Sequence, residues 1–353
     1  MKTKLLNTLE RVIESKYCPA LKFVLGFAIL ASLPVWLDVY FLGYGLGTWI
    51  PLSVLIVTLI WAFTGQAWNI MSGFTGMFSF GHAAFFGLGA YTTMKLVVDY
   101  GINPWFGMFV GGFLASLLGV FIGYLTFRFD VKGHYFALAT LAFAELTRSI
   151  IENWAFLNDV RGYFRPFPRE YAEGPGLVAF QFQSELGYYY LILGFLALIT
   201  IVTWGIRRSA IGYYFFAIRE DEDAARSLGI PTLRYKLLGI TVSAFFTAWA
   251  GSFWSMYFST IEPGTVFNLT RNVEILLPAI IGGFGTITGP IYGALMIVPF
   301  AEVLRQSFEL SGLHLVIYGI FVIVIVIYNP RGIAKWIGDV KRYALRRFRK
   351  WAE

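Results

Sequence analysis

RRSAIGYYFFAIREDEDAARSLGIPTLRYK, residues 207–236, is a hydrophilic stretch inside an otherwise membrane-like chain. Apolar segments long enough to cross a bilayer, which takes about 20 residues, lie on either side of it at 187–206 and 237–258. A soluble, helix-prone segment held between two spanning helices is usually a contact surface for another protein. The stretch therefore predicts a polytopic membrane protein with a docking segment.

The composition supports this interpretation. Of 353 residues 57% are hydrophobic and 14% are charged, which is too apolar for a water-soluble globule of this size. The mean hydropathy is +0.65 and the sequence pI is about 9.3. The net charge of +7 gathers at the two ends of the chain, residues 1–22 and 331–353. Cations placed there suit the anionic lipid of the cytoplasmic leaflet, so membrane lipid is an expected partner and nucleic acid is not.

No catalytic chemistry is expected. Cys18 is the only cysteine, so the chain has no internal disulfide framework and no cysteine-based metal site. His82, His134 and His314 show no metal-ligand spacing, and no hydrolase or metalloprotease motif occurs. Neither an enzyme, a metal nor a cofactor is predicted. Since there is no phosphate-binding loop either, any ATP that drives the protein must bind to a separate subunit.

Apolar segments of membrane length predict an all-α fold of about ten transmembrane helices, including glycine-broken segments. Three regions are expected: a cytoplasmic amphipathic segment 1–20, a transmembrane permease domain 21–330 and a basic cytoplasmic tail 331–353. Lys/Arg-rich loops, including 207–236, should face the cytoplasm, and the acidic loop 152–186 should face outside. Both termini are thus expected inside the cell membrane. The expected spans are 21–41, 49–64, 105–127, 134–151, 187–206, 237–258 and 313–328, with broken segments at 66–98 and 272–304.

The two broken segments resemble each other in kind. SGFTGMFSFGH at 72–82 and GGFGTITGP at 282–290 each interrupt an apolar region with glycines. Paired interruptions in the two halves of a transporter point to the substrate path, because helix ends at mid-membrane expose backbone donors and acceptors. The alternative is that the glycines only let helices pack closely. The translocation path is predicted at Ser79, Gly81, His82, Phe85, Glu145, Glu274, Gly282, Gly283 and Gly285.

Three ionisable residues of this set also have structural explanations. Glu145 and Arg148 lie three residues apart on one helical face, so they can form an internal salt bridge. His82 follows a glycine break and can either cap a half-helix near the substrate or make a structural hydrogen bond. Glu274 is expected to stabilise a helix start through the helix dipole.

Several motifs carry a family resemblance. DAARSLGIP, residues 223–231, is similar to the EAA-x-x-x-G loop of ABC importer permeases, with Asp in place of the leading Glu. Two alanines give a smooth helical surface, and the glycine ends the helix. Further runs, in family order, resemble the branched-chain amino acid permeases of the LivM type: MFSFGHAAFFGLGAYT (77–92), KGHYFA (132–137), AIREDE (217–222), YKL (235–237), IGGFGTITGP (281–290) and YNPRG (328–332).

The resemblance implies a permease subunit of an ATP-driven importer for branched-chain or related hydrophobic amino acids. It implies a second LivH-type permease subunit, two cytoplasmic ATPase subunits and an external substrate-binding protein as partners. The family often has a Gly-Gly-x-x-Gly-Leu element in the large external loop, of which this chain keeps only Gly174-Pro175-Gly176-Leu177. The chain also has Pro278 where the family more often has Met or another apolar residue. ATPase coupling is assigned to Arg219, Glu220, Asp223, Ala224, Ala225, Gly229, Ile230 and Pro231.

Other functions stay open from the residues. Urea and short-amide permeases belong to the same superfamily. An ion-coupled secondary transporter, working alone, would use membrane-embedded acids, for which Glu145 and Glu274 are the candidates. A non-transporting membrane scaffold would need no glycine-broken segments.

Overall fold

Helices make up nearly all of the described chain. The computed structural model describes residues 18–36, 40–41, 44–45, 51–166, 176–307, 313–329, 332–336 and 339. Most of segment 1–20 and of tail 331–353 lie outside these residues. The long helices are α2 Cys18–Trp36, α4 Leu52–Trp68, α5 His82–Tyr100, α6 Pro104–Arg128, α7 Gly133–Glu152, α9 Glu185–Arg208, α12 Thr232–Phe258, α14 Leu269–Gly283, α15 Gly289–Ser307 and α16 Leu313–Tyr328.

Short elements fill the connections. Two antiparallel strand pairs occur, β1 with β2 and β3 with β4, and the second pair ties the loop after α7 to the end of α12. The short elements are β1 Tyr40–Phe41, β2 Tyr44–Gly45, η1 Asn69–Gly73, η2 Ala155–Leu157, η3 Asp159–Arg161, β3 Tyr163–Phe164, α8 Gly176–Ala179, α10 Ala210–Glu220, α11 Glu222–Ser227, β4 Thr260–Ile261 and α13 Pro263–Val266.

Four helices among the described residues are long and apolar enough to cross a membrane. They are Leu52–Gly73, Pro104–Arg128, Glu185–Arg208 and Thr232–Phe258, and Phe23–Val35 and Val316–Tyr328 are shorter apolar helices. The all-α, multi-pass expectation is therefore confirmed. The count of about ten crossings stays a prediction.

One expected boundary was wrong. The sequence suggested one span at 49–64 and a separate broken segment beginning at residue 66, but α4 continues through Trp68 into the π-helical turn η1 and ends only at Gly73. The interior glycine of this stretch, Gly65, does not interrupt the helix. It lies where Pro278 of α14 packs closely, and small residues suit such contacts. The first break therefore lies between the end of η1 and the start of α5, with Phe74 and Thr75 still helical.

The core is built around α4, α5 and α12. Nearly every residue of α4 is buried, and α12 packs against both α5 and α6. The backbones of α5 and α12 approach so closely that a Cβ at Gly89 would collide with the carbonyl of Ala248, and one at Gly251 with that of Phe86. Close packing, the alternative reading of the glycines, thus holds at these two positions.

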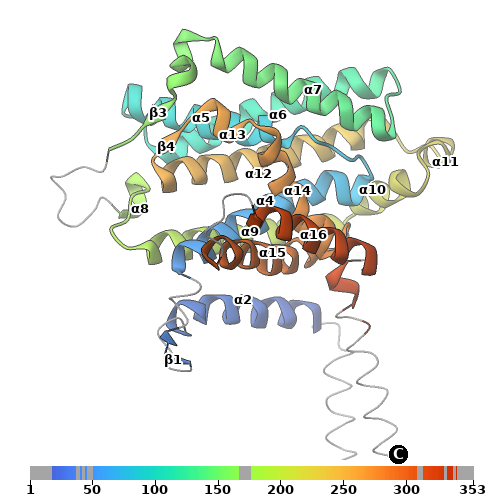
Figure 1. Cartoon of the computed structure of the whole chain (residues 1–353). Coiled ribbons are helices and arrows are strands. Elements are labelled where there is room, and N and C mark those ends of the chain that lie inside the picture. Colours follow the sequence, from blue (N-terminus) through green and yellow to red (C-terminus); the bar gives the residue numbers. More distant parts are fainter. Residues whose placement is uncertain are drawn as a thin grey trace, which may run out of the picture.

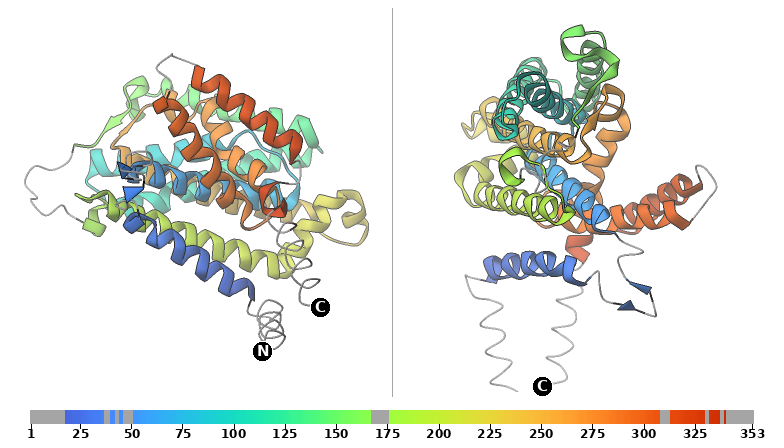
Figure 2. Two further views of the ribbon diagram at one scale, coloured as in Figure 1. Left: turned by 60° about the horizontal axis from the view of Figure 1, so that its bottom comes forward. Right: turned by 90° about the vertical axis from the view of Figure 1, so that its left-hand side faces the viewer.

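The bundle has two distinct ends and two outer flanks. In Figure 1 α10 and α11 lie at one end, while β3, β4 and α8 lie at the other. Helix α7 lies along one flank and α2 along the opposite one, where it contacts α9 (Figure 2). Exposed apolar side chains on α6, among them Phe106, Phe113 and Phe121, suit contact with lipid or with another membrane subunit.

Candidate functional site

The first break is a compact turn held by hydrogen bonds. Helix α4 ends in η1, and π-helical turns of this kind are frequent at functional sites. Gly76 then takes a positive φ of 77°, which turns the chain back at little steric cost. The indole Nε1 of Trp68 donates to the carbonyl of Ser79 at 2.9 Å. The break is therefore an ordered element.

His82, the first residue of α5, has a partner on each ring nitrogen. Its Nε2 lies 2.8 Å from Ser243 Oγ, and its Nδ1 lies 3.2 Å from Ser79 Oγ. Because the Ser243 hydroxyl donates to the carbonyl of Ala67, it accepts from His82, which assigns the proton to Nε2. The structural hydrogen bond, one of the two readings of this histidine, is thus present.

The second break forms where α14 and α15 meet. Gly282 and Gly289 are packed so tightly that a Cβ on the former would overlap the carbonyl of the latter. Gly285 has a φ of 73°, and Thr286 Oγ1 accepts from the backbone N–H of Gly289 at 3.0 Å. At Gly282, Gly285 and Gly289 only a residue without a side chain fits.

Two asparagines join the halves of the chain at these breaks. Asn69 in η1 accepts from the N–H of Gly285 and donates to the carbonyl of Thr286, both at 2.8 Å. Asn272 of α14 accepts from the N–H of Ala83 at 2.7 Å and so caps the start of α5. The two glycine-rich segments, about 200 residues apart in sequence, therefore form one hydrogen-bonded unit.

Arg219 of α10 connects this unit to the hydrophilic stretch. Its Nη1 donates to the carbonyl of Gly73 at 2.7 Å, at the end of η1. Its guanidinium lies 4.8 Å from the ring centre of Phe284, in the second break. One side chain thus touches both breaks, and a Cβ at Gly285 would occupy the place of its Nη1.

The hydrophilic stretch 207–236 forms α10 and α11, together with the last residues of α9 and the first residues of α12. Asp221 caps α11 by accepting from the N–H groups of Asp223 and Ala224, each at 2.9 Å. Gly229 ends the turn with a φ of 83°, and the N–H of Ile230 donates to the carbonyl of Ala225. The predicted helix with a glycine end is confirmed in its geometry.

The two alanines of this helix face different ways. Ala225 is 2% exposed and packs inward, whereas Ala224 lies on the exposed surface. Leu228, which the sequence analysis did not single out, is 82% exposed at the end of α11. Leu228 follows Ala224 by four residues, so the two exposed apolar side chains lie on the same side of α11.

Ion pairs fix α11 against its neighbours. Lys236 binds Glu222 at 2.9 Å, with both side chains largely buried. Lys132, in the loop before α7, contacts Asp130 at 3.1 Å and Asp223 at 3.4 Å. The hydrogen bond to Asp130 raises the pKa of Lys132, so this lysine stays charged at neutral pH. Helix α11 is therefore seated on α12 and on the α6–α7 loop.

The structure brings together most, but not all, of the predicted path residues. Six of them lie in or beside the two breaks: Ser79, Gly81, His82, Gly282, Gly283 and Gly285. Phe85 packs against His82, with 5.3 Å between the two ring centres. Glu145 lies elsewhere, on the outer helix α7, paired with Arg148 at 3.0 Å. The expected salt bridge of Glu145 is confirmed. Its role in a path stays a prediction.

The capping role expected of Glu274 was wrong. Asn268 is the residue that caps α14, accepting from the N–H of Arg271 at 2.7 Å. Glu274 lies more than a turn into the helix, where its carboxylate binds Arg271 at 2.7 Å. The helix dipole acts over the first turn, which Glu274 does not occupy.

Sequence reasoning missed Asn69 and Arg271. Asn69 is a polar residue near the end of an apolar helix, which is itself a signal of function inside a membrane. Arg271 lies three residues before Glu274, the same spacing that identified the pair of Glu145 and Arg148. No cluster of three or more potential metal-ligating side chains occurs among the described residues.

The arrangement defines a class of protein: a polytopic helical membrane protein with glycine-broken segments and a short exposed helix at one end, which is the architecture of a transport permease. Residues 50–326 match the family model described as "Branched-chain amino acid transport system / permease component". The chain belongs to this family of ABC transporter permeases, whose members are transport components and not catalytic enzymes.

Relatives in this superfamily carry different cargo. The chain is 27% identical over 299 residues to the high-affinity branched-chain amino acid transport system permease protein LivM of Escherichia coli, covering 80% of this chain and 69% of LivM. It is 25% identical to the fructose import permease protein FrcC of Rhizobium meliloti, over 43% of this chain and 42% of FrcC. It is 26% identical to the autoinducer 2 import system permease protein LsrC of Klebsiella pneumoniae, over 54% of this chain and 53% of LsrC. No solved structure matches the chain.

Proposed function

We propose that this chain is a permease subunit of an ATP-driven importer for branched-chain or related hydrophobic amino acids. It would pair with a LivH-type permease, carry two cytoplasmic ATPase subunits and receive its substrate from an external binding protein. The extent of the similarity to LivM, which covers 80% of this chain, favours amino acids over the sugar and autoinducer 2 named for the shorter matches.

The observation that carries the proposal is the connection of α11 to the two breaks. Helix α11 offers Ala224 and Leu228 to a partner, and the adjoining α10 supplies Arg219, which binds the Gly73 carbonyl and stacks on Phe284. A push on α11 would therefore reach both glycine-broken segments through one side chain. Coupling needs such an element with different contacts in two states.

The proposed orientation places α10 and α11 in the cytoplasm of a cell with both chain termini inside. The stretch 207–236 carries more Lys/Arg than the loop 152–186, as the positive-inside rule expects of cytoplasmic loops. Ten described helices have at least 15 residues, the number that ten crossings of the inner membrane would need: α2, α4, α5, α6, α7, α9, α12, α14, α15 and α16.

An ion-coupled transporter working alone has less support. Such a protein would use acids that gain and lose a proton or bind a cation inside the membrane. Glu145 and Glu274, the acids considered for that role, each bind an arginine at 3.0 Å or closer. An acid already paired in this way is a weak site for a transported cation.

The test is an arginine on the docking surface. Ala224→Arg places a charge on the exposed face of α11, so ATPase subunits should no longer co-purify and ATP-driven leucine uptake into proteoliposomes should be lost. Ala155→Arg is the matched control, an exposed alanine at the opposite end, and should keep the ATPase subunits bound. Normal ATPase binding and normal uptake by the Ala224→Arg protein would refute the coupling assignment. Uptake by the purified chain alone, driven by an ion gradient, would favour the secondary transporter.

A further inference from the structure

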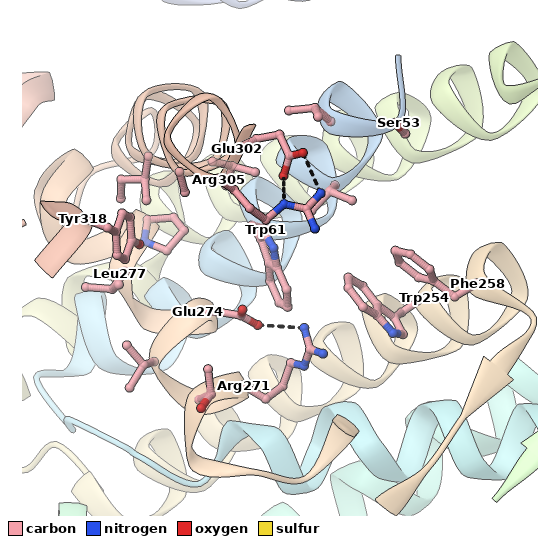
Figure 3. A pocket seen from close by; sticks show the side chains of 18 of the residues that line it. Ser53, Trp61, Trp254, Phe258, Arg271, Glu274, Leu277, Glu302, Arg305 and Tyr318 are labelled. Carbon is pink, nitrogen blue, oxygen red and sulfur yellow. Dashed lines mark hydrogen bonds and ion pairs between the residues drawn. The ribbon is translucent and has the colours of Figure 1, made fainter. Parts of the chain in front are cut away.

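A cavity of about 610 Å³ lies at the end of the bundle opposite α11. Its walls come from the first half of α4, the last residues of α12, the first half of α14 and the second half of α15, with Tyr318 from α16 (Figure 3). Since α12 begins beside α11 and ends at this cavity, the two sites lie at opposite ends of one helix. The volume is in the range of small-molecule sites.

A charged pair of α14 faces the cavity. Arg271 donates from Nη1 to Glu274 at 2.7 Å and from Nε to the carbonyl of Thr265 at 3.1 Å. The side chain of Arg271 is 11% exposed, while that of Glu274 is 40% exposed. Figure 3 shows the carboxylate and the guanidinium side by side at the cavity wall. The described hydrogen bonds use two of the three guanidinium nitrogens.

Aromatic rings hold the guanidinium in place. It lies 4.3 Å from the ring centre of Trp254 and 5.1 Å from that of Trp61. Arginine tolerates such a site because its planar cation is weakly hydrated and stacks on ring faces. The lining also holds the aliphatic side chains of Val57, Leu277 and Ile297, together with a second ion pair, Arg305 with Glu302 at 2.6 Å. Charged groups thus sit next to an apolar wall.

From this geometry we infer that the cavity binds a zwitterionic amino acid with an apolar side chain. Arg271 would take the α-carboxylate, Glu274 the α-ammonium group, and the aliphatic wall the side chain. A zwitterion carries the complementary charges on neighbouring atoms, so it can exchange with the internal ion pair without adding net charge to the site. A lone amine would leave the largely buried guanidinium of Arg271 without a carboxylate, which is costly, and a lone carboxylate would leave Glu274 without a cation. The inference rests on the proposed function and names the site of its substrate.

The position of the cavity suits a substrate that arrives from outside. Pro278, in its wall, is one helical turn before Gly282, where the second break begins. Nearer to α11, Trp68 packs against Phe284 with 5.9 Å between the ring centres, and Asn69 joins the two breaks. The structure therefore has the larger cavity on the proposed outer side, and packed side chains lie between it and a smaller cavity of about 240 Å³ on the side of α11. An importer waiting for substrate needs this arrangement.

The test uses a cysteine as a reporter of occupancy. In the assembled complex with Cys18→Ser, Ala301→Cys places one thiol in the cavity wall. We expect L-leucine to slow its labelling by N-ethylmaleimide, in the absence of binding protein and ATP. Neither 4-methylpentanoate, which lacks the ammonium group, nor 3-methylbutylamine, which lacks the carboxylate, should protect it. Asn153→Cys, exposed at the end of α7, should react at the same rate with and without leucine.

A second variant tests the proposed contact directly. Glu274→Gln keeps an acceptor for Arg271 but removes the charge, so half-maximal protection should need about 10- to 100-fold more leucine. No protection by leucine, equal protection by either analogue, or protection by urea or acetamide instead would overturn the inference. ATP-driven leucine uptake is measured on the same preparation of the unaltered complex. Uptake without protection rejects only the cavity, whereas absent uptake rejects the proposed function.

Discussion

Arg219→Gln should uncouple ATP hydrolysis from transport. The substitution removes a charge-assisted hydrogen bond of 2.7 Å to the Gly73 carbonyl and a cation–π contact of 4.8 Å with Phe284. The first is worth about 1.5–3 kcal/mol and the second about 0.5–1 kcal/mol. Together they amount to about 2–4 kcal/mol of interaction between α10 and the two breaks. Because about 1.4 kcal/mol corresponds to a factor of ten, the equilibrium that α11 controls should shift by about 30- to 1000-fold.

The assay compares two rates in proteoliposomes that contain the complete importer. The Arg219→Gln complex should keep its ATPase subunits and hydrolyse ATP, because α11 and its exposed face do not change. Leucine uptake per ATP should fall at least about tenfold, since the push on α11 no longer reaches both breaks. Arg219→Lys keeps the charge but not the planar guanidinium, so its leucine uptake per ATP should lie between that of the unaltered complex and that of Arg219→Gln.

Arg234→Gln is the matched control. Arg234 is exposed near the start of α12, so its loss should leave uptake per ATP unchanged. The reasoning would be refuted if Arg219→Gln transported leucine with the same yield per ATP as the control. Loss of ATPase binding in that variant would instead mean that Arg219 shapes the docking surface itself.

Two further predictions concern stability. Asn69→Leu leaves an N–H and a carbonyl of the second break buried without their partner, which costs about 1–3 kcal/mol for each group. The thermal midpoint of the purified complex should therefore fall well below that of the control Asn153→Leu, which changes an exposed asparagine. Unchanged midpoints would mean that water replaces the amide. Gly89→Ala should separate α5 from α12 and reduce folded yield in detergent, whereas Gly194→Ala, which meets open space, should be neutral or stabilising by about 0.5–1 kcal/mol. Equal yields for these two alanine variants would contradict the close approach of the helices.

Some features of the structure could be predicted because they depend on residues near one another in sequence. The salt bridge of Glu145 with Arg148 needs only a helix and a spacing of three. The turn at Gly229 needs only a glycine after a short helical run. Glu274 shows the limit of local reasoning, since its expected capping role depended on where α14 begins, and Asn268 begins it.

Other features depend on contacts across the chain. Asn69 meets Gly285 over 216 positions, and Arg219 meets Gly73 over 146. No local pattern predicts such a pairing, because the amide and the guanidinium could equally have bound nearer carbonyls. The cavity at Arg271 could not be predicted locally either, since its wall needs side chains from five helices.

The hydrophilic stretch 207–236 and the apolar segments around it determined by themselves that this is a helical, multi-pass membrane protein with a short glycine-ended helix between two spans, since burial in lipid and helix capping follow from composition and short spacings. The tertiary structure alone decided which face of α11 is exposed, that Arg219 joins it to both breaks, and that a charged cavity lies at the far end. The physical reason is that a polar group inside a packed bundle takes whichever partner the folded helices bring within reach.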